Sequence, residues 1–118
     1  MPIAPPIHAL TKQNLAHAPD GPGVYALYRQ NGEMQLIFYG GSLHSVRDRL
    51  RNHQSGNCDP CTQQATHFAC EATPVEQVLA RHAGLMFDHH RENGRLPQCN
   101  DVTNWPEWFA LDRDSFGH

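Results

Sequence analysis

One dipeptide limits what this chain can fold into: Asn31-Gly32 lies between two short runs of strand-forming residues, 24–29 and 34–39. Both runs are rich in aliphatic and aromatic side chains that favour strands. An Asn-Gly pair suits a two-residue hairpin turn, because both central residues of that turn need positive φ. The sequence therefore predicts an antiparallel hairpin over residues 23–40.

Weaker capping and periodicity signals place the other elements. Apolar residues spaced by three and four predict a helix over 46–53, with Ser42 or Ser45 as its cap. Thr73-Pro74 opens a second helix that runs to about Arg91 and is terminated by Asn93-Gly94. That second helix would bury a stripe made of Val75, Val78, Leu79, Leu85, Met86 and Phe87. We also expect a short helix over 11–17 capped by Thr11, a third strand over 65–71, an extended segment over 96–100 and a last helix over 105–111. This order predicts one α+β domain over residues 1–118.

Composition narrows the class of protein. The 118 residues carry 9 Lys and Arg against 12 Asp and Glu, a net charge of −3, so a non-specific nucleic-acid coat is disfavoured. Only Arg47, Arg49 and Arg51 form a local basic cluster. Residues 1–6 lack the features of a signal peptide, and no apolar run is long enough to span a bilayer. We therefore expect a cytoplasmic protein without a membrane partner.

Four cysteines, at positions 58, 61, 70 and 99, leave two alternatives open. Without an export signal they would be free thiols or metal ligands. Cys58 and Cys61 have the spacing of a zinc knuckle, but no second pair follows, so Cys70, Cys99 or His67 would have to complete the site. Unrelated free cysteines are the favoured interpretation.

Five side chains could meet in one cleft. We expect the hairpin to bring Tyr25 and Tyr39 near each other across the sheet. Arg49 and His53 are four residues apart, so both project from one face of a helix that folds back over that sheet, and Glu76 opens the next helix. Arginine can clamp a phosphate, a carboxylate can hold Mg²⁺, and tyrosine or histidine can deprotonate water. This set favours phosphodiester cleavage.

At these residues the chain resembles the GIY-YIG nuclease superfamily. The similarity covers roughly residues 20–101 and keeps the order of the family's motifs. The matching residues are Gly23-Val24-Tyr25, Tyr39-Gly40-Gly41, Ser45-Val46, Arg49-Leu50, His53, Glu76, Pro97 and Asn100.

The resemblance implies a three-stranded antiparallel sheet flanked by helices, and a hydrolytic site on one face of that sheet. It implies that Glu76 holds one divalent cation, Mg²⁺ or Mn²⁺, and that Arg49 contacts the scissile phosphate. It further implies roles for the remaining residues: Tyr25 and Tyr39 position or activate water, His53 handles a proton, and Asn100 holds the site together by hydrogen bonds.

Three departures from the family pattern leave questions open. Gly40 replaces a β-branched residue, which we expect to loosen the end of the strand. The interval from Glu76 to Asn100 is long, so Glu71 or Glu92 could be the acid instead. The acidic balance suggests a partner subunit, a fused domain or an unusual substrate. In a toxin, the partner would be an inhibitor protein.

The expected function is a metal-dependent endonuclease acting on DNA. The alternative is an inactive module of the same fold that binds nucleic acid or protein, with a cysteine-bound zinc. Retention of the whole residue set favours the enzyme. Its biological role could be in repair, mobile elements or phages, restriction, or a toxin.

Overall fold

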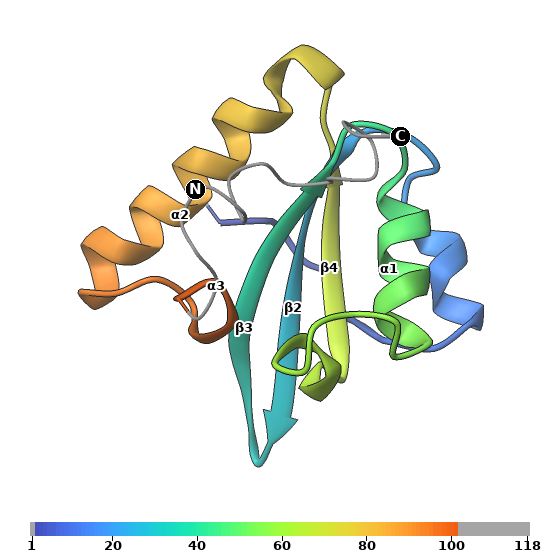
Figure 1. The fold of residues 1–118 in the computed structure, drawn as a ribbon, viewed down its shortest axis with the longest axis horizontal. Coiled ribbons are helices and arrows are strands. Elements are labelled where there is room, and N and C mark those ends of the chain that lie inside the picture. The colour runs from blue at the N-terminus through green and yellow to red at the C-terminus, as the bar shows by residue number, and fades with distance from the viewer. Residues whose placement is uncertain (1, 102–118) are drawn as a thin grey trace.

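A long hairpin forms the centre of the computed structural model, which describes residues 2–101 (Figure 1). Strands β2 (Gly23–Asn31) and β3 (Glu33–Ser42) pair antiparallel around Gly32, whose φ is +86°. The hairpin predicted from Asn31-Gly32 is therefore confirmed. Its register shifts once, between Leu27 and Tyr28, where the pairing is interrupted by a β-bulge.

Two further strands complete the sheet. Strand β4 (His67–Ala72) pairs antiparallel with β2, and the short β1 (His8–Ala9) pairs with β4, which gives the order β1-β4-β2-β3. The α+β class is confirmed. The sheet has four strands instead of three because β1 adds a two-residue edge, which is too short to leave a periodic signal in the sequence.

The two long helices cover opposite faces of the sheet (Figure 1). Helix α1 (Val46–Gln54) packs on the face of Leu27 and Phe68, and helix α2 (Val78–Asn93) packs on the face of Val24 and Ala26. Each layer encloses its own apolar cluster. The sheet therefore presents two separate environments, one under each helix.

The second helix buries a different set of residues from the predicted one. It starts with a 3-10 turn, η3 (Val75–Gln77), and continues as α2 to Gly94, whose φ of +78° ends it as expected. Because the 3-10 turn changes the rotation per residue, Val75 does not share the buried stripe. Val75, Leu79 and Phe87 are exposed, and the buried positions are Val78, His82, Leu85 and Met86.

Shorter elements also depart from expectation. The first helix is a 3-10 helix, η1 (Gln13–His17), although the Thr11 hydroxyl does accept a hydrogen bond from the Asn14 amide. A short helix, α3 (Gln98–Asp101), stands where an extended segment was predicted. A 3-10 turn, η2 (Thr62–Gln64), lies in the loop before β4. The helix predicted over 105–111 lies outside the described residues.

A disulfide joins Cys61 to Cys99, with their Cα atoms 5.5 Å apart. The expectation of free or metal-binding thiols is wrong for this pair, because residues 38 positions apart meet only in the folded chain. Cys58 and Cys70 are free thiols. Within residues 2–101, no group of three or more His, Cys, Asp or Glu could hold a metal ion, so the zinc site is not supported.

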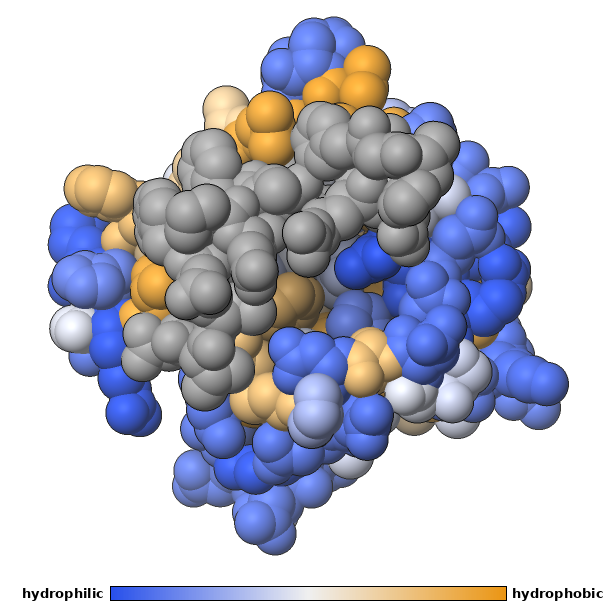
Figure 2. Space-filling model, in the orientation of Figure 1, coloured by the Kyte–Doolittle hydropathy of each residue, from blue (hydrophilic) through white to orange (hydrophobic). Residues whose placement is uncertain are grey.

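Polar and charged residues cover most of the described surface visible in Figure 2. None of the helices between residues 2 and 101 has both the length and the apolar content that a bilayer crossing requires.

Candidate active site

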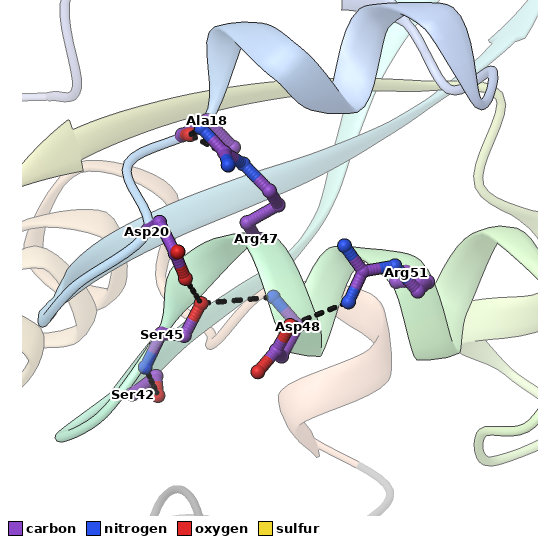
Figure 3. A network of polar contacts seen from close by, with 7 residues as sticks. All are labelled: Ala18, Asp20, Ser42, Ser45, Arg47, Asp48 and Arg51. Atoms are coloured by element: carbon purple, nitrogen blue, oxygen red, sulfur yellow. Dashed lines mark hydrogen bonds and ion pairs between the residues drawn. The ribbon is translucent and has the colours of Figure 1, made fainter.

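Hydrogen bonds at its first turn fix the position of helix α1 (Figure 3). The Ser45 hydroxyl accepts from the Asp48 amide at 3.2 Å and donates to Asp20 at 2.8 Å, while the Ser42 hydroxyl accepts from the Ser45 amide at 2.9 Å. Ser45 is therefore the cap and Ser42 supports it. This arrangement sets the rotation of α1 and hence the direction of Arg49 and His53.

The neighbouring arginines of α1 have structural roles. Arg47 donates to the carbonyl of Ala18 at 3.0 and 3.2 Å, and Arg51 pairs with Asp48 on the solvent side (Figure 3). Arg51 thus forms a surface ion pair, and Arg47 fastens the helix to a backbone carbonyl. Arg49 is the member of the trio that contributes to the candidate site.

Tyr25 and His53 meet beneath α1. The Tyr25 hydroxyl and His53 Nε2 are 3.0 Å apart, and both side chains are buried. Phe38 closes one side of this pair, with ring centroids 6.2 Å from Tyr25 and 6.0 Å from His53. The pairing of Tyr25 with a helical histidine is the contact expected if both act on one proton.

Gly40 makes room for the Tyr25 ring. Gly40 lies directly opposite Tyr25 on β3, and a Cβ at this position would overlap Cζ and Oη of Tyr25. The glycine therefore fixes the tyrosine by close packing, and the expectation that it loosens the strand is wrong. Gly23 has a comparable reason, because its Cβ would overlap the Glu71 carbonyl oxygen.

His53 is held in its neutral form. Burial lowers its pKa to about 4, and the positive charge of Arg49 acts in the same direction. At neutral pH the ring can therefore accept a proton. If the Tyr25 hydroxyl donates to Nε2, the ring proton lies on Nδ1.

We expect the fold to lose stability in acid because His53 and His82 are buried. The pKa values of His53 and His82 are both lowered from 6.5 to about 4 in the folded chain, chiefly by burial. Between these values the unfolded chain binds more protons, so the free energy of unfolding falls as the pH drops from 6.5 towards 4. We expect each histidine to contribute about 3 kcal/mol to this loss.

Urea denaturation across this pH range measures the effect. His53→Gln and His82→Gln should each flatten the dependence, and His44→Gln, which replaces an exposed histidine, should keep the wild-type slope. A wild-type stability that stays constant from pH 6.5 to 4 would contradict the prediction.

Tyr39 lies on the opposite face of the sheet from Tyr25. It pairs with Ala26, the neighbour of Tyr25, and it belongs to the apolar cluster under α2. The register near the turn, where Arg29 pairs with Gln35, would place Tyr25 opposite Tyr39 if it continued unchanged, but the bulge shifts it by one residue. The expected proximity of the two tyrosine side chains across the sheet is therefore wrong.

Burial also determines the protonation of Tyr39. Its pKa is raised to about 12, mainly by desolvation and then by the neighbouring Tyr28. At neutral pH Tyr39 is therefore a hydrogen-bond donor and not a base. Its ring meets the His89 ring edge-on, with centroids 6.4 Å apart.

Asn100 holds the backbone of Tyr39 in place. Its Oδ1 accepts from the Tyr39 amide at 2.9 Å, and its Nδ2 donates to the Tyr39 carbonyl at 3.0 Å. His82 Nε2 donates to the same carbonyl at 3.0 Å. Sequence reasoning missed His82, although its position four residues after Val78 and three before Leu85 matches the buried stripe.

The three candidate acids differ in how accessible their carboxylates are to a metal ion. Glu71 is bound by Arg81 through two oxygens, at 2.8 and 3.0 Å, so it is committed to an ion pair. Glu76 lies exposed in η3 and Glu92 lies exposed near the end of α2. An exposed carboxylate fits Mg²⁺, which commonly takes one or two protein carboxylates and keeps several waters.

Three solved structures with a similar fold are of one nuclease domain. The GIY-YIG N-terminal endonuclease domain of UvrC from Thermotoga maritima, bound to magnesium as its catalytic cation, matches with a TM-score of 0.53 and 18% identity. The match covers 74% of this chain and 91% of that domain. Two point mutants of the same domain match with TM-scores of 0.53, at 19% and 18% identity.

Sequence comparison gives a consistent but shorter match. UvrABC system protein C of Moorella thermoacetica is 39% identical over 59 residues, which cover 49% of this chain. The chain spans only 9% of that relative's length. No protein-family model matches. The resemblance to GIY-YIG nucleases is thus confirmed, and the chain has the fold of a GIY-YIG domain.

Proposed function

We propose that this chain is an endonuclease domain that hydrolyses phosphodiester bonds in DNA. The observation that carries the proposal is the 3.0 Å contact between the Tyr25 hydroxyl and a neutral His53, with Arg49 close enough to lower the pKa of that histidine. Attack of water on a phosphate diester requires a group that takes up the proton of the water and a positive charge that stabilises the phosphate oxygens. The Tyr25–His53 pair and Arg49 provide these two groups. The fold shared with a known nuclease domain supports this interpretation.

The proton path follows from the protonation states. Tyr25 gives its proton to His53 Nε2 as the phenol oxygen takes one from the attacking water. Arg49 holds the phosphate and offsets its developing charge. Tyr39, on the other face of the sheet, keeps its proton, and Asn100 fixes the strand that carries it.

The proposed cofactor is Mg²⁺ or Mn²⁺, with Glu76 as its protein ligand. Glu76 makes no hydrogen bond or ion pair with the described residues, so its carboxylate is available, unlike that of Glu71. Glu92 is the remaining alternative, since its charge is felt at Tyr39. When bound, the cation would stabilise negative charge on the leaving oxygen.

The proposed partner is DNA, and the proposed role is in repair, because the curated relative is a UvrABC system protein. That relative is far longer than this chain, and the net charge of −3 gives little general attraction for DNA. We therefore propose that a partner subunit or fused domain supplies part of the affinity.

Cleavage of supercoiled plasmid and of single-stranded DNA tests the proposal. We expect nicking with Mg²⁺ or Mn²⁺ and none with a chelator. Glu76→Gln should lower the rate by at least about tenfold, whereas Glu92→Gln should behave as wild type. The opposite result for the two variants would mean that Glu92, and not Glu76, is the metal ligand.

Absence of cleavage by the folded wild type on both substrates, with either metal, would overturn the enzyme proposal. It would favour the alternative of a binding module.

A further inference from the structure

The Cys61–Cys99 disulfide ties helix α3 to the loop that precedes β4. Cys99 is fully buried in the apolar cluster under α1, and the next residue, Asn100, is fully buried as well. Helix α3 has only four residues and lies beside β3 (Figure 1). Because a single helical turn is not stable on its own, the position of α3 depends on tertiary contacts, and the disulfide is the covalent one.

Cys61 is also held from its own side of the disulfide. Its amide donates to Asp59 Oδ1 at 2.8 Å, and its carbonyl accepts from Gln64 Nε2 at 3.1 Å. Gln64 is in turn fixed by Arg29, whose guanidinium donates to Gln64 Oε1 at 2.6 Å. None of these contacts involves α3, so loss of the disulfide would leave Cys61 in its turn and release Cys99.

A free thiol lies three residues before Cys61, at Cys58. Hydrogen bonds close the turn that holds both cysteines: Gln63 donates from its side chain to the Cys58 carbonyl and from its amide to the Asp59 carbonyl, each at 3.1 Å. Cys58 and Cys61 are partly exposed, whereas Cys99 is buried. The Cys-x-x-Cys spacing is typical of cysteine pairs that alternate between dithiol and disulfide forms.

We propose that these three cysteines form a thiol–disulfide exchange site. The Cys58 thiolate attacks Sγ of Cys61, a disulfide forms between these two residues, and the bond from Cys61 to Cys99 breaks. The electron pair of the broken bond leaves on Cys99 Sγ, which takes up a proton in place of the one that Cys58 released. The number of disulfides is unchanged, so the exchange requires no outside oxidant or reductant.

The exchange would loosen the hydrogen bonds that fix β3. Asn100 follows Cys99 directly and binds both the amide and the carbonyl of Tyr39. Once Cys99 is released, α3 can move away from β3, and the Tyr39 amide then loses Asn100 Oδ1 as its acceptor. The exchange itself rests on the cysteines alone, and its effect on DNA cleavage rests on the proposed nuclease function.

Peptide mass spectrometry of the oxidised protein tests the exchange. The protein is incubated without added thiol at about pH 8.5, where ordinary thiols are partly ionised, and is then quenched with N-ethylmaleimide in acidic denaturant. In wild type we expect a free, alkylated Cys99 and a Cys58–Cys61 disulfide in about 0.1 to 10% of molecules, at the same fraction for two protein concentrations. Cys58→Ser should yield no free Cys99. Cys70→Ser, which removes the other free thiol, is the matched control and should behave as wild type.

Hydrogen exchange followed by NMR tests the release of β3. In Cys61→Ser, which cannot form the disulfide, the Tyr39 amide should exchange at least about tenfold faster than the amide of Ala26 in the central strand. Cys58→Ser keeps the disulfide and should show the wild-type ratio of the two rates. The mass-spectrometric test does not use Cys61→Ser, so it decides on the exchange even if this variant does not fold.

The outcomes separate the exchange site from the nuclease proposal. Absence of free Cys99 in wild type, or its presence at the wild-type level in Cys58→Ser, would overturn the exchange site. A common exchange rate for Tyr39 and Ala26 in Cys61→Ser would overturn the link from the disulfide to β3. Neither measurement involves DNA, so a wild type that exchanges its disulfide but cleaves no DNA would overturn the nuclease proposal alone.

Discussion

Replacing Arg49 by alanine is expected to lower the rate of DNA cleavage by about a hundredfold or more. The charge of this guanidinium is felt at His53, and removal of one donor to a developing oxyanion commonly costs this much. Arg49 also lowers the pKa of His53, so the same variant should raise that pKa. Single-turnover cleavage and an NMR titration of the His53 ring measure the two effects.

Arg51→Ala provides the matched control for this experiment. It removes the same charge two residues further along α1, where the side chain is exposed and pairs with Asp48. We expect its cleavage rate and the titration of His53 to match wild type. Equal loss of activity in both variants would mean that Arg49 contributes only general charge, against its proposed role.

Loss of the disulfide is expected to be the most destabilising change. The bond closes a loop over a sequence separation of 38, for which the chain-entropy relation gives a stabilisation of about 4 kcal/mol. Cys61→Ser should therefore unfold at lower urea concentration than wild type. Treatment of the wild type with a dithiol reductant should have the same effect.

The free thiol at Cys58 provides the control. Cys58→Ser removes a cysteine from the same loop without breaking a bond, and it should keep wild-type stability. Wild-type protein whose unfolding is unchanged by the reductant would refute a stabilising cross-link.

Local signals were sufficient for the elements that local interactions determine. The turn at Asn31-Gly32, the cap at Ser45 and the helix end at Gly94 each depend on residues within a few positions of one another, and all three occur as predicted. The antiparallel sheet flanked by helices also agrees with the family resemblance. These features carry Tyr25, Arg49 and His53 to one side of the sheet.

Features that depend on distant contacts were not predictable. A single β-bulge moves the side chain of Tyr39 to the other face of the sheet. Nothing in the sequence of residues 34–39 indicates where such a bulge would occur. The link between Cys61 and Cys99 and the burial of His82 likewise arise from tertiary packing. The sequence therefore predicted the residues of the candidate site better than it predicted their arrangement.

The hydrogen bonds between Asn100 and the backbone of Tyr39 affect the order in which parts of the fold can form during protein synthesis. The two residues are 61 positions apart, so β3 emerges from the ribosome long before Asn100, whose side chain forms hydrogen bonds with the backbone of Tyr39. Until residue 100 is free to fold, the carbonyl of Tyr39 lacks the bond from Asn100 that supplements the one from His82, and its amide lacks the bond to Asn100 Oδ1. On this account the strand that carries Tyr39 stays incompletely fixed until residue 100 has left the ribosome.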